Sequence, residues 1–324
     1  MNPTTSTTSV TDGTASAAVV DEAFVLGGNV FGWTADAAES FAVLDAFVED
    51  GGRMIDTADV YSAWVPGNAG GESEEIIGRW LASRGHRDRV QIATKVGRHP
   101  NAQGLTRTAI RTGLEASLRR LNTDYLDVYC AHFDDPDTPL EETLAAFDEL
   151  VREGVVRHLA ASNYPPERLR EAFDLCEAHG WARFELVQAH YNLVRREKFE
   201  TQLRPLLLER GVAALPYYSL AQGFLTGKYR QADNAESGVR SSAALRYLNE
   251  RGRRVLDTLD GIADAHGVPV AAVALAWLRA QPAVAAPLAS ARTPRQLADL
   301  NAARTLRLTP EELTALDDAS SWTR

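Results

Sequence analysis

Short apolar runs alternate along this chain with longer stretches in which apolar residues recur every three or four positions. The short runs indicate buried strands, and the longer spacing indicates helices with one apolar face. The clearest helix places Ile110, Leu114, Leu118 and Leu121 in a single stripe. The predicted strands cover residues 24–28, 54–55, 90–94, 126–131, 156–161, 186–189, 212–216 and 284–288.

Two further helices are followed by glycines, which favour a helix end because they adopt the left-handed conformation without strain. The helix around residues 41–47 is expected to end at Gly51-Gly52, and the helix of residues 140–150 is expected to end at Gly154. Regular alternation of strand and helix predicts a parallel sheet, and eight such units close into a barrel.

An open, doubly wound sheet is the competing α/β architecture. Such a sheet usually binds dinucleotides through a GxGxxG turn after its first strand, and residues 27–32 (GGNVFG) lack that spacing. No Pro/Gly/Ser-rich linker divides the middle of the chain. We therefore predict a single-domain (β/α)8 TIM barrel over residues 23–324, preceded by a flexible, Ser/Thr-rich tail over residues 1–22.

Composition narrows the possible partners and compartment. The 34 basic and 44 acidic residues give a net charge of −10, which disfavours nonspecific binding to nucleic acid or to an anionic membrane. No apolar run approaches the roughly 18 residues of a membrane span. Two cysteines, Cys130 and Cys176, lie in apolar surroundings and are expected to be buried, reduced thiols, which favours a cytoplasmic location. Monomer and homo-oligomer both remain open.

Polar residues with catalytic potential follow three consecutive predicted strands. Asp56 and Tyr61 follow the second, Lys95 follows the third and His132 follows the fourth. Each residue alone has an ordinary structural explanation. Because the carboxyl ends of barrel strands meet on one rim, the four are expected to converge at one site.

Several motifs resemble those of the aldo-keto reductase family, from about Leu26 to Ala319. The resemblance is closest to the bacterial members related to potassium-channel β subunits. It implies a barrel that binds NADPH without a Rossmann fold, and a catalytic set of Asp56, Tyr61, Lys95 and His132. The motifs are residues 56–61 (DTADVY), 71–74 (GESE), 93–95 (ATK), 162–164 (SNY) and 223–228 (GFLTGK).

The chemistry of carbonyl reduction agrees with these assignments. Hydride transfer to a carbonyl leaves negative charge on the oxygen, which Tyr61 would protonate as the general acid. The ordinary pKa of tyrosine, near 10, is too high for efficient acid–base work at neutral pH. We expect Lys95, held by Asp56, to lower it. His132 would donate a hydrogen bond to the same oxygen.

The resemblance also implies a cofactor site that prefers NADPH over NADH. Tyr217, or else Tyr218, would stack on the nicotinamide, and Arg292 would bind the adenosine 2′-phosphate. Where many relatives carry Glu-Asn to hold the adenine, this chain has Asp299-Leu300, with Asn301 next. The predicted cofactor residues are Gly28, Asn29, Asp56, Ser162, Asn163, Gln188, Tyr217, Ser219, Leu220, Ala221, Lys228, Arg240, Ser290, Arg292, Gln296 and Asp299.

Phe31, Trp33, Trp64 and Phe133 follow predicted strands and could form an apolar substrate pocket. Aldehydes, simple ketones, aryl carbonyls and keto-sugars all remain open as substrates, and no basic cluster beyond the cofactor residues indicates an acidic one.

The chain is therefore predicted to reduce an aldehyde or ketone to the alcohol with NADPH. The alternative is a cofactor-binding regulatory subunit or redox sensor. Channel β subunits typically lack the catalytic histidine, so His132 favours an enzyme. A metal-dependent hydrolase is disfavoured because the seven histidines are scattered and form no HxH pair, so no metal site is predicted.

Overall fold

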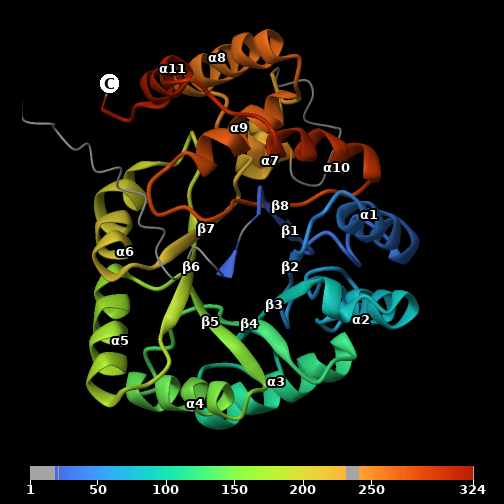
Figure 1. Ribbon diagram of the computed structural model, residues 1–324, viewed down its shortest axis with the longest axis vertical. Helices are drawn as coiled ribbons and strands as arrows, with labels where there is room; N and C mark the ends of the chain where they lie inside the picture. Colours follow the sequence, from blue (N-terminus) through green and yellow to red (C-terminus); the bar gives the residue numbers. More distant parts are fainter. Residues whose placement is uncertain (1–18, 21, 231–240, 324) are drawn as a thin grey trace, which may run out of the picture.

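The computed structural model describes residues 19–20, 22–230 and 241–323. Eight parallel strands form one sheet in the order β7-β6-β5-β4-β3-β2-β1-β8. The sheet closes where the Ala214 N–H donates to Ala283 at 2.6 Å and the Ala285 N–H donates to Ala214 at 2.9 Å. Helices surround this barrel (Figure 1), which confirms the predicted single-domain TIM barrel. The strands are β1 (Val25–Gly27), β2 (Met54–Asp56), β3 (Gln91–Val96), β4 (Leu126–Ala131), β5 (Val156–Ser162), β6 (Phe184–His190), β7 (Ala213–Tyr217) and β8 (Leu288–Ala289).

The predicted helix ends agree with the structure. The first ends at Glu49, just before Gly51, and α4 ends at Arg152, just before Gly154. The stripe that begins at Ile110 packs one face of α3 into the core. The helices are α1 (Ala37–Glu49), α2 (Glu72–Arg84), α3 (Arg107–Leu121), α4 (Leu140–Arg152), α5 (Pro166–His179), α6 (Arg204–Arg210), α7 (Ser241–Leu245), α8 (Glu250–His266), α9 (Val270–Arg279), α10 (Pro294–Asn301) and α11 (Pro310–Ser320).

The last strand differs from its prediction over residues 284–288. Ladder pairing is confined to Leu288–Ala289, and Val284 makes only a single bridge to Ala214. Ala283 has a positive φ of 66°, and Pro287 has no N–H to donate. These two features keep the apolar run from forming a longer strand.

Alternation along the strands explains which side chains reach the rim. Met54, Ala93 and Val128 belong to the apolar cluster that fills the barrel. Side chains two positions later on a strand point the same way, one layer higher. By this spacing Asp56 lies above Met54, and Lys95 lies above Ala93. The same alternation places Gly27, His132, Ser162, Gln188, Tyr217 and Ser290 two positions after the inward-facing Val25, Cys130, Ala160, Leu186, Leu215 and Leu288.

The amino-terminal mouth of the barrel contains Val19 and Val20. Their side chains are buried in the barrel cluster, and the Gln91 side chain at the start of β3 donates to the Val19 carbonyl at 3.4 Å. Glu22 lies 3.7 Å from Arg304 in an ion pair. The predicted tail of residues 1–22 therefore extends too far, because its last apolar residues close the barrel. Residues 1–18 lie outside the described part of the chain.

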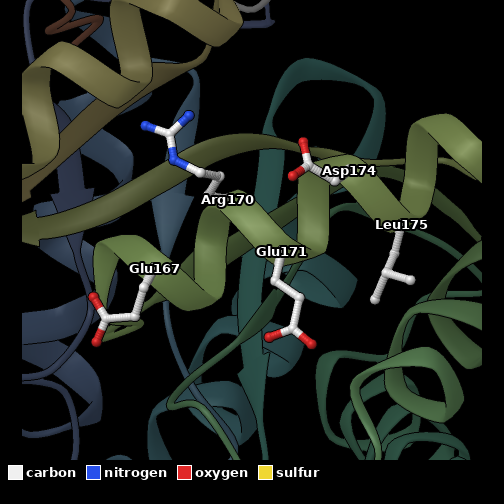
Figure 2. Close-up of a pocket in the computed structure, with 5 residues that line it drawn as sticks. All are labelled: Glu167, Arg170, Glu171, Asp174 and Leu175. Atoms are coloured by element: carbon white, nitrogen blue, oxygen red, sulfur yellow. The ribbon is translucent and has the colours of Figure 1, made fainter.

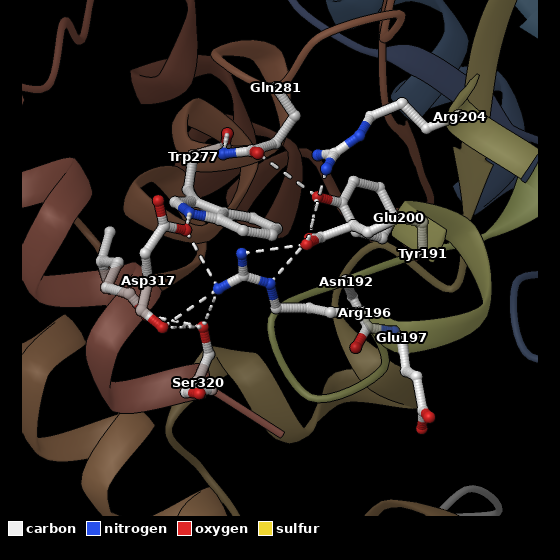
Figure 3. Close-up of polar contacts among 12 residues, drawn as sticks. Tyr191, Asn192, Arg196, Glu197, Glu200, Arg204, Trp277, Gln281, Asp317 and Ser320 are labelled. Atoms are coloured by element: carbon white, nitrogen blue, oxygen red, sulfur yellow. Dashed lines mark hydrogen bonds and ion pairs between the residues drawn. The ribbon is translucent and has the colours of Figure 1, made fainter. Parts of the chain in front are cut away.

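Arg196 forms a buried polar network that ties the segment after β6 to α9 and α11 (Figure 3). Its Nε lies 2.7 Å from Glu200, in the π-helical turn η3 (Phe199–Leu203), and its Nη1 donates to Ser320 at 2.7 Å. Tyr191 donates to the same carboxylate at 2.7 Å. Only 10% of the Arg196 side chain and 5% of the Glu200 side chain are exposed.

We expect Arg196→Met to lower the free energy of unfolding by about 3–5 kcal/mol, because it leaves the buried Glu200 carboxylate with only the longer 3.9 Å contact to Arg204. Arg170→Met is the matched control. Arg170 lies on the outer face of α5 (Figure 2) and pairs with Glu209 at 2.8 Å with both side chains about half exposed. Its loss should cost about 0–1 kcal/mol. Equal shifts of the two urea denaturation midpoints would contradict the assignment.

Within the described residues, no single helix is long and apolar enough to cross a membrane; α8 and α9 reach that length and composition only as a pair joined across a 99° bend.

Candidate active site

A cavity of about 1820 Å³ opens at the carboxyl ends of the strands. It exceeds the roughly 300–1,000 Å³ of a usual small-ligand site. The predicted catalytic residues line it together, as do most of the predicted binding residues. The predicted residues at its surface are Asp56, Tyr61, Lys95, His132, Asn29, Ser162, Asn163, Gln188, Tyr217, Ser219, Leu220, Lys228, Ser290, Arg292, Gln296, Asp299, Trp33, Trp64 and Phe133.

The Lys95 ammonium makes three hydrogen bonds at this site, and its side chain is only 2% exposed. Nζ donates to Asp56 Oδ2 at 2.7 Å, to the Thr57 carbonyl at 2.7 Å and to Tyr61 Oη at 2.9 Å. All three ammonium hydrogens therefore have an acceptor. The second Asp56 oxygen accepts from Gln188 Nε2 at 2.6 Å, which fixes the carboxylate between β3 and β6.

Tyr61 is a protonated donor at neutral pH. Burial raises the pKa of Tyr61 to about 12, although the Lys95 charge lowers it. The sequence-based expectation of a net lowering by Lys95 is wrong, because the desolvation of a buried phenolate outweighs the attraction. An ammonium only donates, so the Tyr61 oxygen is the acceptor in their contact. The phenolic hydrogen is thereby left for a different acceptor.

The His132 imidazole is neutral. Burial, with the positive charges of Lys95 and Arg98, holds the pKa of His132 well below its ordinary value. Its Nδ1 is buried and has no hydrogen-bond partner among the described residues. Orphaned buried N–H groups are rarer than orphaned acceptors, so we assign the proton to Nε2. The Tyr61 and His132 rings approach edge to face at 6.2 Å, which places two neutral donors side by side.

Asn163 joins three strand ends on the opposite wall. Its Nδ2 donates to the His132 carbonyl at 3.0 Å and to Ser162 Oγ at 2.9 Å. Its Oδ1 accepts from Tyr217 Oη at 2.8 Å. The residue has a φ of 57°, a left-handed conformation that asparagine tolerates well. These bonds fix the Tyr217 ring at the cavity surface.

Positive groups line the cavity on the side of β7 and β8. Lys228 and Arg292 reach its surface, as does the amino end of α9, which carries partial positive charge. The loop after β7 has three successive positive φ angles, 48° at Ala221, 60° at Gln222 and 98° at Gly223. For a non-glycine residue this conformation costs about 1–3 kcal/mol and is concentrated at ligand sites.

One predicted contact near β1 is corrected. The Gly28 backbone is turned toward Asp56 and Ser73, with hydrogen bonds of 2.7 and 2.8 Å, and does not line the cavity. Gly27 lines it instead. A β-carbon on Gly27 would lie 2.6 Å from Ser290 Oγ, so a larger residue here would force the Ser290 hydroxyl to move.

Phe31 and Ala221 are completely buried and do not line the cavity, so neither is a direct contact as predicted. Phe31 packs in the main core, directly beneath Gly28. Arg240 lies outside the described residues.

The loops after β3 and β4 provide walls of the cavity that were not predicted from the sequence. Arg98, residues 103–106, Asp134, Asp135, Asp137 and Thr138 all reach the cavity. Their signal was their position directly after Lys95 and His132, at the carboxyl ends of two barrel strands. Among the described residues, no three His, Cys, Asp or Glu side chains are grouped to hold a metal ion.

Comparison with known proteins agrees with this geometry. The sequence model of the Aldo/keto reductase family matches residues 23–321. The chain belongs to the aldo/keto reductase family. It is 31% identical over 290 residues to norsolorinic acid reductase B of Aspergillus parasiticus, covering 86% of this chain and 74% of that protein.

Two other proteins that are similar to this chain have different names. Oxidoreductase YrpG of Bacillus subtilis is 34% identical over 302 residues, covering 90% of each chain. A probable voltage-gated potassium channel subunit beta of Arabidopsis thaliana is 32% identical over 283 residues, covering 82% of each. Family and reductase-named relatives together support an oxidoreductase that acts on carbonyl compounds.

This aldo/keto reductase presents Leu300 to the cavity where many family members are expected to carry asparagine. Asn301 does not line the cavity and cannot replace that amide. Its Nδ2 donates to Asp50 at 2.5 Å, and its Oδ1 accepts from Arg304 at 3.0 Å. Asp299 and Gln296 are the polar side chains of α10 that remain at the cavity surface.

Proposed function

We propose that this protein reduces an aldehyde or ketone to its alcohol with NADPH, and that Tyr61 is the general acid. The observation that carries the proposal is the buried contact of Lys95 with Asp56, Thr57 and Tyr61. It holds the Tyr61 oxygen on a fixed cation and leaves the phenolic hydrogen for a substrate. A reduced nicotinamide, when bound, supplies the hydride.

The proton chemistry follows from the two neutral donors. Tyr61 and the Nε2–H of His132 would both donate to the carbonyl oxygen, which orients and polarises it. As charge develops on that oxygen, Tyr61 gives up its proton, and the nearby Lys95 ammonium stabilises the phenolate that remains. Asp56 and Gln188 keep Lys95 in place throughout.

The residues present fit a phosphorylated dinucleotide. The cavity is large, and Lys228, Arg292 and the amino end of α9 offer positive charge on one side in an otherwise acidic protein. Ser162, Asn163 and Gln188 offer amide and hydroxyl groups near Tyr217, on the side where a nicotinamide amide would bind. Arg292 is exposed at the cavity surface and would meet the 2′-phosphate.

We expect Arg292→Ala to weaken NADPH binding about 10- to 100-fold and to leave NADH nearly unchanged, because only NADPH carries the 2′-phosphate. Titration of both cofactors measures this. Arg295→Ala, at the second residue of α10 and outside the cavity lining, is the matched control and should bind both cofactors normally. Equal losses for NADPH and NADH would remove the phosphate assignment.

Turnover distinguishes this proposal from a regulatory role of the channel-subunit kind. NADPH consumption with aldehydes or ketones supports an enzyme, whereas NADPH binding without any turnover supports the regulatory alternative. We further infer a cytoplasmic location, which is supported by two buried, free cysteines, Cys130 and Cys176.

A further inference from the structure

Five aromatic rings form a continuous chain along the cavity mouth, with the proposed acid in the middle. Trp33 and Trp64 meet edge to face at 5.5 Å, and Trp64 meets Tyr61 at 6.1 Å. Beyond Tyr61, the His132 ring lies 6.2 Å away, and Phe133 lies 5.2 Å from His132. A wall of aromatic rings, mostly packed edge to face, thus extends to both sides of the reacting position.

The exposed large apolar side chains of the protein gather at this place. Four are exposed among the described residues: Trp64 at 49%, Phe133 at 37%, Tyr218 at 43% and Leu208 at 53%. The first three line the same cavity, and only Leu208, on α6, lies elsewhere. Apolar surface concentrated in this way marks a binding site rather than chance exposure.

Arg98 adds a cation at one end of the aromatic chain. Its guanidinium lies over the Phe133 ring at 4.2 Å, and it lines the cavity. It makes no ion pair or hydrogen bond with another residue in the described part of the chain. A guanidinium stacked on a ring still presents its N–H edge, which suits bidentate binding of a carboxylate. Arg98 also contributes to the low pKa of His132, so its charge is felt at the reacting position.

Nearby acidic side chains do not cancel this cation. Asp134 is paired with Arg168 at 3.0 Å. Asp135 accepts from the Leu105 N–H and the Thr138 hydroxyl, both at 2.7 Å, which keep it ionised but hold its carboxylate on the loop after β4, and it makes no ion pair with Arg98 among the described residues. Asp137, also at the cavity surface, is exposed to solvent and makes no ion pair with Arg98 among the described residues.

We propose that the preferred substrate is an aromatic aldehyde or ketone that carries a carboxylate, with its ring on the Trp64–Phe133 wall and its carboxylate on Arg98. This inference rests on the proposed carbonyl reductase function and narrows its substrate class. It departs from the sequence analysis, in which no cation outside the cofactor residues indicated an acidic substrate. Neutral keto-sugars have no carboxylate to pair with this cation.

The test compares 4-carboxybenzaldehyde and 3-carboxybenzaldehyde with their neutral methyl esters, and with propanal, in NADPH oxidation assays. Wild-type protein should prefer at least one acid over its ester in kcat/KM. Arg98→Met should raise KM for that acid about 10- to 100-fold relative to the KM of its ester. Trp64→Ala should weaken acid and ester alike, and both more than propanal. Arg170→Met is the surface control.

Binding provides a second measurement that needs no turnover. Titration with 4-(hydroxymethyl)benzoate, followed by tryptophan fluorescence, should saturate in wild-type protein and weaken by the same factor in Arg98→Met. If the esters and propanal are reduced but no acid is preferred and Arg98→Met changes nothing, this inference fails and the reductase function stands. If no carbonyl in the panel is reduced, the proposed function itself fails.

Discussion

Tyr61→Phe should lower kcat by about 10²- to 10⁴-fold while NADPH affinity stays within about twofold, because only the proton donor is removed. The ring that packs against Trp64 and His132 is retained, so the cavity keeps its shape. Steady-state kinetics with a reducible aldehyde and a fluorescence titration of NADPH measure the two quantities separately.

The matched control removes a phenolic oxygen elsewhere. Tyr125 lies between the guanidinium groups of Arg87 and Arg157, at 3.7 and 4.1 Å from its ring, and does not line the cavity. Tyr125→Phe keeps that ring and should keep full activity. A Tyr61→Phe variant that retained most of its turnover would transfer the acid role to His132 or to water.

Lys95→Met should abolish nearly all turnover and also destabilise the protein by about 3–5 kcal/mol, because it leaves the Asp56 carboxylate buried without its cation. The pKa of Tyr61 would rise further, since Lys95 is the main group that lowers it. Urea denaturation and steady-state kinetics of the same preparation measure the two losses.

A second variant separates catalysis from folding. Lys95→Met combined with Asp56→Leu removes both charges and should recover part of the lost stability, because no uncompensated carboxylate remains. Activity should stay at the level of the single variant. If activity returned with stability, the role of Lys95 would be to support the fold and not to assist Tyr61.

The sequence predicts the barrel well because strands and helices follow from a periodic, local pattern of apolar residues. Alternation on β2 and β3 determines that Asp56 and Lys95 point inward above Met54 and Ala93, and the closed sheet brings those ends together. The Asp56–Gln188 contact connects positions 132 residues apart and follows from the closure of the barrel.

Features that depend on local backbone conformation or on desolvation were not predictable in this way. Three successive positive φ angles after β7, from Ala221 to Gly223, have no periodic signature. The net direction of the Tyr61 pKa shift depends on how deeply the phenol is buried, which a sequence pattern does not give. In the sequence, Val19 and Val20 are two apolar residues in a polar tail, and only the folded structure shows that they fill the barrel mouth.

The residues that set cofactor and substrate preference are also not determined by the periodic pattern of the sequence. Arg292 was assigned to the 2′-phosphate through the family resemblance, whereas Arg98 has no such signal in the sequence, and only its place in the cavity suggests a partner for it. The loops after β3 and β4 become walls because their strands are neighbours, with Lys95 paired to Cys130 in the sheet.

Transfer of deuterium from labelled NADPH most directly tests the central claim that this site delivers hydride from NADPH to a carbonyl. NADPH labelled with deuterium at C4 of the nicotinamide, on either face, is incubated with the protein and a reducible aryl aldehyde, and the alcohol is analysed by mass spectrometry. With the label on one of the two faces, deuterium should appear on the carbinol carbon in proportion to the NADPH consumed, and Tyr61→Phe should slow its appearance by orders of magnitude. Alcohol without deuterium from either labelled form, or no alcohol at all, would contradict direct hydride transfer at this site.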